Sequence, residues 1–482
     1  MAAPASVSAP LGAPDRDITR SLRIPILILF VSASIWLIIA SAFGLIASIK
    51  FHQPNFLADS PLLTYGRARP AFLDSMLYGF CVQAALGVSL WLFVRLGRAP
   101  LAQPWLVIAG AKLWNLGVTI GVLGILIGQQ SGFEYLEVPG YAAWIMMLGY
   151  LLFGIAAVLS FHRRVERGLY VSHWFVLAAL FWFPWIFSTA ELLLIKYPVR
   201  GMAQVAIAWW YVANLKSTFL PLAGLACVFY FIPKLTSHEL HSRHLALFTF
   251  WVVTLFGGWC GVPNSAPLPA WMPTLSTAMS VLLLLAAVTV ALNVHGTLDG
   301  RWSKLGANPP LRFLRVGVCG FILAILLSAV SALVDTNYPV AFTWLTPALA
   351  QLNYYGFFAM VMFGAIYSLL PRLLGVGFPS PKLVRAHFWL ALLGLLLGIV
   401  PLGIDALFEA PALNNPNVAF LQVVKGTLLF LRVSTLGDLL LGAGHVLFCA
   451  NISGITLRFY RPRVVSAYDN ATADLFATEG HS

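Results

Sequence analysis

Long apolar runs, separated by short polar turns, recur along the whole chain. Each run has about the length that a helix needs to cross the hydrocarbon core of a bilayer, roughly 20 residues. The pattern therefore predicts an all-α integral membrane protein of about twelve transmembrane helices. The predicted spans cover residues 24–47, 71–95, 104–128, 141–161, 172–193, 203–232, 244–262, 272–293, 312–334, 346–371, 384–405 and 428–451.

Positive charge gathers at alternate turns of this predicted bundle. Cytoplasmic loops of membrane proteins carry an excess of Lys and Arg, and most of the 29 Lys and Arg residues fall in the two terminal segments and in every second turn. We therefore expect both termini to be cytoplasmic. We also expect three parts: a flexible N-terminus over residues 1–22, a membrane domain over residues 23–460 and a disordered tail over residues 461–482.

Composition agrees with a membrane protein and excludes several functions. Hydrophobic residues make up 60% of the 482 residues, charged residues 10%, and the mean hydropathy is +0.85, far from the values of a soluble domain. The net charge of +12 is explained by turns that lie against anionic lipid, so it gives no reason to expect a nucleic-acid partner. The five cysteines form no CxxCH motif, which excludes covalently attached c-type heme.

Several motifs in the spans and turns resemble one family, in the same order along the chain. They are Leu63–Pro70, Phe133–Pro139, Trp209–Lys234, Phe250–Trp251, Leu268–Trp271, Phe363–Arg372 and Lys382–Trp389. Through them the chain resembles subunit I of the C-family (cbb-type) heme-copper cytochrome c oxidases and, more distantly, the large subunit of the nitric oxide reductases. The resemblance runs along nearly the whole chain. It implies the heme-copper oxidase subunit I fold, with two hemes and a copper held by six histidines inside the bilayer.

The heme ligands that the resemblance implies are replaced in this chain. Neutral imidazole ligates heme iron without adding charge to the bilayer interior. The family's heme positions fall on Phe72, at the low-spin heme, and on Leu349 and Gln351, one for each iron. Of the ten histidines, only His445 lies deep in an apolar run. We therefore expect no heme; if the family chemistry survives, the cofactors are b-type heme and copper.

The copper site that the resemblance implies is replaced as well. Its three ligand positions fall on Ala213, Pro263 and Asn264, and the family's redox tyrosine falls on Gly257. None of these side chains replaces an imidazole as a copper ligand. We therefore expect no bound metal and no catalytic residue of the family type.

The ionisable residues left inside the spans are the next candidates, because charge in hydrocarbon is costly and usually functional. Lys216 lies three residues after Ala213, on the same helix face, and points toward the volume of the family's metal centre; it is equally explained as a snorkelling or ion-paired lysine. Its candidate partners are Asp438 and Glu191. His445 is either a proton-relay group or, more typically, a hydrogen-bonded histidine of the bundle.

Other polar residues in the spans have simpler explanations. Lys112 lies in the first turns of its span, where a lysine snorkels to the surface. Gln351, Asn353 and Asn214 are expected to donate hydrogen bonds between helices rather than to bind substrate.

Three functional hypotheses follow from the sequence. The first is a non-catalytic, cbb-type subunit I-like component of a respiratory membrane complex in a bacterial inner membrane, with other membrane subunits or a c-type cytochrome as partners. The second is an active terminal oxidase or nitric oxide reductase subunit that uses other heme ligands. The third is a transporter or channel that reuses the cavity, with Lys216 as its charged gate. The first accounts best for family motifs that are kept beside replaced ligands.

Overall fold

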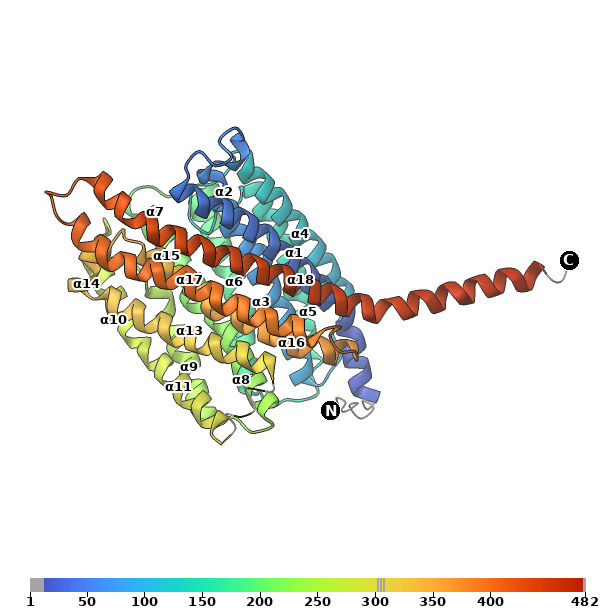
Figure 1. Ribbon diagram of the computed structural model, residues 1–482. Helices are drawn as coiled ribbons and strands as arrows, with labels where there is room; N and C mark the ends of the chain where they lie inside the picture. The colour runs from blue at the N-terminus through green and yellow to red at the C-terminus, as the bar shows by residue number, and fades with distance from the viewer. Residues whose placement is uncertain (1–12, 301–302, 304–305, 307, 480–482) are drawn as a thin grey trace.

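The protein is an all-helical bundle, as the apolar runs predict. The computed structural model describes residues 13–300, 303, 306 and 308–479, and no residue of these ranges lies in a β-strand. Eleven helices within this described part are long and apolar enough to cross a membrane, and they lie side by side (Figure 1). The spans are α1 (Ala13–His52); α2, η2 and α3 (Tyr65–Asp74, Ser75–Cys81, Val82–Gly97); α4 (Pro104–Leu126); α5 (Gly140–His162); α6 and η3 (Val171–Ala190, Glu191–Lys196); α7, η4 and α8 (Met202–Asn214, Leu215–Phe219, Leu220–Thr236); α10 and α11 (Trp271–Leu282, Leu284–Leu298); α13 (Pro309–Ala332); α15, η6 and α16 (Leu345–Gln351, Leu352–Ala359, Met360–Leu374); α17 (Pro381–Leu413); and α18 (Phe420–Glu479).

The seventh predicted span, residues 244–262, is shorter than expected. It forms α9 (Arg243–Phe256), which has 14 residues, followed by the short η5 turn (Gly257–Trp259). Fourteen residues rise only about 21 Å, less than the hydrocarbon thickness of a bilayer. Just after the end of α9, Gly257 packs closely on η4, where a Cβ would lie 2.3 Å from the carbonyl oxygen of Ser217.

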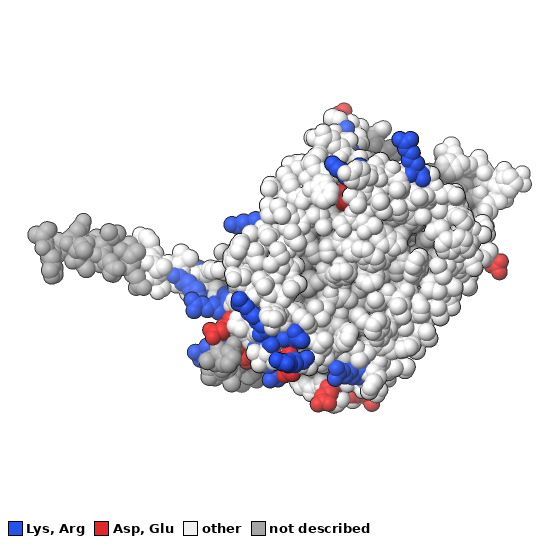
Figure 2. Space-filling view, turned by 180° about the vertical axis from the view of Figure 1, so that it is seen from behind, with Lys and Arg blue, Asp and Glu red and all other residues white. Residues whose placement is uncertain are grey.

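The outer surface of the bundle has the pattern of a membrane protein. Figure 2 shows Lys, Arg, Asp and Glu gathered mainly toward two opposite ends of the face it presents, with a broad, nearly uncharged region between them. Many large apolar side chains of the bundle are exposed, among them Leu123, Leu151 and Phe181. Such exposure is stable in lipid, where apolar side chains need no cover.

Both ends of the described chain are helical, and the predicted division into a flexible N-terminus, a membrane domain and a disordered tail stays a prediction. α1 already begins at Ala13, and Ile18 and Leu22 are buried because their apolar side chains pack on the bundle. At the other end, α18 continues to Glu479 and projects from the bundle (Figure 1). The sequence carries no glycine between Gly454 and Gly480 that would end this helix earlier. Residues 1–12 and 480–482 lie outside the described part of the chain, and the cytoplasmic placement of both termini stays a prediction.

The first and last helices, α1 and α18, lie side by side and are joined by buried hydrogen bonds. Ser41 Oγ lies 2.6 Å from His445 Nδ1, and Ser48 Oγ lies 2.9 Å from Thr435 Oγ1. Ser41 and Ser48 are seven residues apart, which places them on the same face of α1. Polar pairs of this kind fix the register of two helices in a bilayer.

Four spans contain π-helical segments, η2, η3, η4 and η6. A π turn takes in one more residue than an α turn, so it rotates the side chains that follow it, and such turns are frequent at functional sites. η4 carries Lys216, and η6 carries Tyr354 and Tyr355. All three of these residues line the cavities described next.

Candidate functional site

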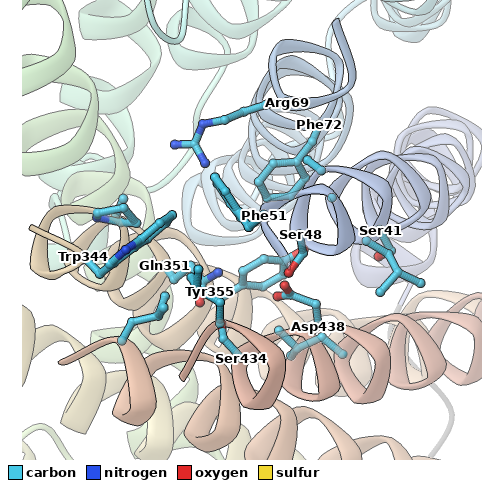
Figure 3. Close-up of a pocket in the computed structure, with 18 of the residues that line it drawn as sticks. Ser41, Ser48, Phe51, Arg69, Phe72, Trp344, Gln351, Tyr355, Ser434 and Asp438 are labelled. Atoms are coloured by element: carbon cyan, nitrogen blue, oxygen red, sulfur yellow. The ribbon is translucent and has the colours of Figure 1, made fainter. Parts of the chain in front are cut away.

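The first cavity lies between α1, α2, α15, η6, α17 and α18. Phe72 and Gln351, which are predicted heme positions, both line it, together with Arg69, Tyr355 and Asp438 (Figure 3). The structure therefore pairs Gln351, rather than Leu349, with the low-spin position at Phe72. The cavity has a volume of about 60 Å³, which is room for a few water molecules.

The residues around this first cavity do not fit a heme. The Phe72 ring has no lone pair, and it packs so closely on α1 that a Cβ at Gly44 would lie 3.0 Å from it. Gln351 turns toward α17, where a Cβ at Gly398 would lie 3.2 Å from Gln351 Oε1. Pockets for drug-sized ligands measure about 300–1,000 Å³, several times the 60 Å³ found here. Phe72 and Gln351 thus occupy space beside a cavity of about 60 Å³ and offer no imidazole to it.

The second cavity is much larger, about 520 Å³, and lies between α7, η4, α10, α13 and α15. Ala213, Pro263 and Leu349 line it, so three predicted metal positions from distant segments meet around one volume. Asn264, the remaining predicted copper position, is used in the loop instead. Its backbone N–H donates to Asn337 Oδ1 at 2.9 Å, and its side-chain amide donates to the carbonyl of Ala332 at 3.0 Å.

The second cavity does not fit the family's heme and copper either. Its three predicted ligand positions carry Ala, Pro and Leu, which offer no donor atom, and the described ranges hold no cluster of three or more His, Cys, Asp or Glu side chains suited to a metal ion. Gly257 leaves no space for the redox tyrosine, since even a Cβ would meet Ser217. Cys260 lines the cavity, but its thiol donates to the carbonyl oxygen of Phe256 at 3.4 Å.

Lys216 lies on η4 and lines the large cavity, as its spacing from Ala213 predicts. Its ammonium group lies 5.4 Å from the centre of the Tyr135 ring. The predicted partners lie elsewhere: Asp438 lines the small cavity and Glu191 is buried on η3. The ion pairs found among the described residues are Arg69–Glu134 and Arg95–Asp15, so Lys216 has no ion-pair partner there.

His445 is a buried histidine of the bundle with one hydrogen bond, from Nδ1 to Ser41, and its ring stacks on Tyr355 at 5.4 Å between centroids. Sequence reasoning missed a second one. His387 on α17 is also fully buried, with Nδ1 2.9 Å from the hydroxyl of Tyr367, which in turn accepts a hydrogen bond from Asn451 at 3.0 Å. The positions of Val384, His387, Ala391 and Gly394 share one buried helix face, which was the available signal.

Three buried carboxyl groups form a cluster that the sequence did not predict. Asp74 ends α2, Glu137 lies in the loop between α4 and α5, and Glu191 begins η3; all are at most 5% exposed. Burial, and then the neighbouring Asp74 carboxyl, raise the pKa of Glu137 well above its ordinary value. Next to the cluster, the hydroxyl groups of Tyr78 and Tyr211 lie 2.8 Å apart.

The polar side chains predicted to join helices are used in two ways. Asn214 accepts a hydrogen bond from Trp182 at 2.9 Å and donates one to the carbonyl of Gly258 at 3.2 Å, which confirms its role between helices. Asn353 donates only within its own helix and lines the large cavity. Lys112 is exposed on α4, in line with the snorkelling explanation.

The chain is similar to known proteins over most of its length. The family described as Cytochrome C and Quinol oxidase polypeptide I matches residues 25–440. The chain belongs to this family. It is 27% identical over 449 residues to the cytochrome c oxidase subunit 1 homolog of Azorhizobium caulinodans, covering 87% of this chain and 79% of the relative. It is 25% identical over 453 residues to the cbb3-type cytochrome c oxidase subunit CcoN1 of Stutzerimonas stutzeri, covering 90% and 91%.

The solved structure of another protein has the same fold as this chain. A heme-copper terminal oxidase dimer, determined by cryo-EM, superposes with a TM-score of 0.71 at 12% identity, over 90% of this chain and 84% of that chain. The resemblance that the motifs predicted is therefore confirmed, together with the helical membrane fold. The multi-pass membrane character follows from both.

Proposed function

We propose that the protein is a non-catalytic member of the polypeptide I family that serves as a structural or regulatory component of a respiratory membrane complex. The observation that carries this proposal is the replacement of the ligand set in both cavities. The low-spin position is filled by Phe72 and Gln351 around about 60 Å³, and the large cavity has Ala213, Pro263 and Leu349 at its ligand positions. Oxygen reduction needs redox centres that these side chains do not hold.

The proposed setting is the inner membrane of a bacterium, in a complex with other membrane subunits or with a c-type cytochrome. Support comes from the relatives, which are named as subunits of cytochrome c oxidases, and from the long apolar helices.

The deciding experiment is a reduced-minus-oxidised visible spectrum with metal analysis. The protein is expressed in a host with ample heme, purified in detergent, and compared with a cbb-type subunit I handled identically. We expect no stoichiometric b-type heme and no copper in a folded, monodisperse preparation. One heme per chain would overturn the proposal and direct attention to Lys216 and Cys260 as replacement ligands.

A second experiment tests the complex itself. Mild solubilisation of native membranes, followed by affinity purification of the tagged chain and mass spectrometry, should recover membrane subunits of a respiratory complex in constant ratio to the chain. Recovery of the chain alone from mild, cross-linked preparations would contradict the proposed role.

A further inference from the structure

The large cavity combines an apolar wall with one cation. Its apolar wall includes Val253, Leu283, Phe321 and Ile325, and its cation is the side chain of Lys216. A volume of about 520 Å³ lies within the range of sites that bury drug-sized ligands. The cavity therefore has the size and polarity for an amphiphilic molecule.

No carboxylate of the described chain lies within ion-pair distance of Lys216, although Glu134 acts on it from a longer distance. Glu134 also lines the cavity, but it pairs with Arg69 at 3.5 Å and its side chain is 57% exposed. The Tyr135 ring, 5.4 Å from the ammonium group, supplies part of the stabilisation by a cation–π interaction. An isolated charge inside a membrane bundle is costly and normally faces an opposite charge or a functional cavity.

Another cavity lies beside the large cavity, near the surface of the bundle. A neighbouring cavity of about 330 Å³ shares Ala213, Cys260 and Val262 with it. This second volume is lined by Trp259 and Trp271, which are 50% and 62% exposed. Exposed tryptophans are typical of the depth at which lipid head groups meet the acyl chains. The large cavity is therefore separated from this surface-exposed volume only by residues that line both.

From this geometry we infer that the large cavity binds a long-chain fatty carboxylate, with its head group on Lys216 Nζ and its chain along the apolar wall. The inference rests on the proposed function in one respect, because a heme in this cavity would exclude the fatty acid. It assigns a ligand class to the site and does not depend on which complex the chain joins.

The test uses the full chain in nanodiscs and the fluorescent fatty acid cis-parinaric acid, with signal from protein-free nanodiscs subtracted and palmitate as competitor. We expect saturable binding that palmitate displaces. Lys216→Met should weaken binding by at least about tenfold, because the carboxylate loses its counter-charge. Lys112→Met, a matched removal of an exposed lysine, should bind like the wild type.

Two further arms separate charge from space. The methyl ester of the same acid has no charge, so its binding should be unchanged in Lys216→Met. Leu349→Trp places a ring in the cavity and should weaken both acid and ester. Equal binding of the acid by wild type and Lys216→Met would overturn the inference, as would acid binding that Leu349→Trp leaves unchanged. A heme spectrum would overturn both the inference and the proposed function, whereas a colourless protein without acid binding would overturn the inference alone.

Discussion

Substitution of Glu137 by Gln tests the buried carboxyl cluster through the pH dependence of stability. Glu137 is 5% exposed, and burial together with the Asp74 carboxyl raises its pKa well above the ordinary value of a glutamate. The folded protein therefore holds this proton more tightly than the unfolded chain. The stability that the protonated group contributes is fully present below the unfolded pKa and is lost as the pH rises through the folded pKa.

Glu137→Gln removes this proton linkage while it keeps the size of the side chain. The wild type should lose up to about 1.4 kcal/mol per pH unit relative to the variant, over the interval between the unfolded and folded pKa values. We therefore expect the variant to be more stable at neutral and alkaline pH, by a margin that grows with pH. Near the unfolded pKa the two proteins should melt alike.

The assay is thermal unfolding in one detergent, followed by tryptophan fluorescence from about pH 5 to about pH 9, the interval in which a raised carboxyl pKa acts. Glu134→Gln is the control, since this neighbouring carboxylate is 57% exposed and its pair with Arg69 is worth little. A margin between wild type and Glu137→Gln that stays flat or shrinks as the pH rises would refute the raised pKa of Glu137.

Three other variants, one of them double, test the packing and the cavities. Gly257→Ala should lower the free energy of unfolding by about 1–3 kcal/mol, because the new Cβ meets the carbonyl of Ser217, and a lower melting temperature would show it. Asn214→Ala should lower the free energy of unfolding by about 1 kcal/mol, because the indole N–H of Trp182 loses its acceptor. An unchanged unfolding transition would contradict the role of Asn214 between helices. The double variant Phe72→His and Gln351→His should still lack stoichiometric heme, because about 60 Å³ is too small; a pyridine hemochrome assay that finds one heme per chain would show that ligands alone were missing.

The sequence predicted the spans well because length and hydropathy decide whether a segment enters a bilayer. The predicted ligand positions Phe72, Ala213 and Pro263 line cavities, and their assignment as replaced heme and copper positions stays a prediction. The end of α9 at Phe256 was not predicted, because the apolar run continues to Val262 and hydropathy does not distinguish a helix from the 3-10 turn and loop that follow it.

The buried polar groups show where sequence reasoning ends. The burial of Glu137 depends on a loop that folds back between helices, with Tyr135 at a φ of 63° and Gly132 at 83°, and hydropathy does not encode such a path. His387 lies only six residues after Pro381, so depth within the apolar run suggested a surface position. Its neighbours on α16 and α18 bury it, and those contacts exist only in the assembled bundle.

The pairing of α1 with α18 has a consequence for biogenesis. The hydrogen-bond partner of Ser41 on α18 is His445, which is synthesised 404 residues later. At ordinary translation rates of 5–20 residues per second, the ribosome needs about 20–80 s to reach it. Throughout that interval α1 sits in the membrane with polar side chains turned toward a neighbour not yet synthesised, and an insertase or a holding chaperone that shields this face would govern the yield of the assembled protein.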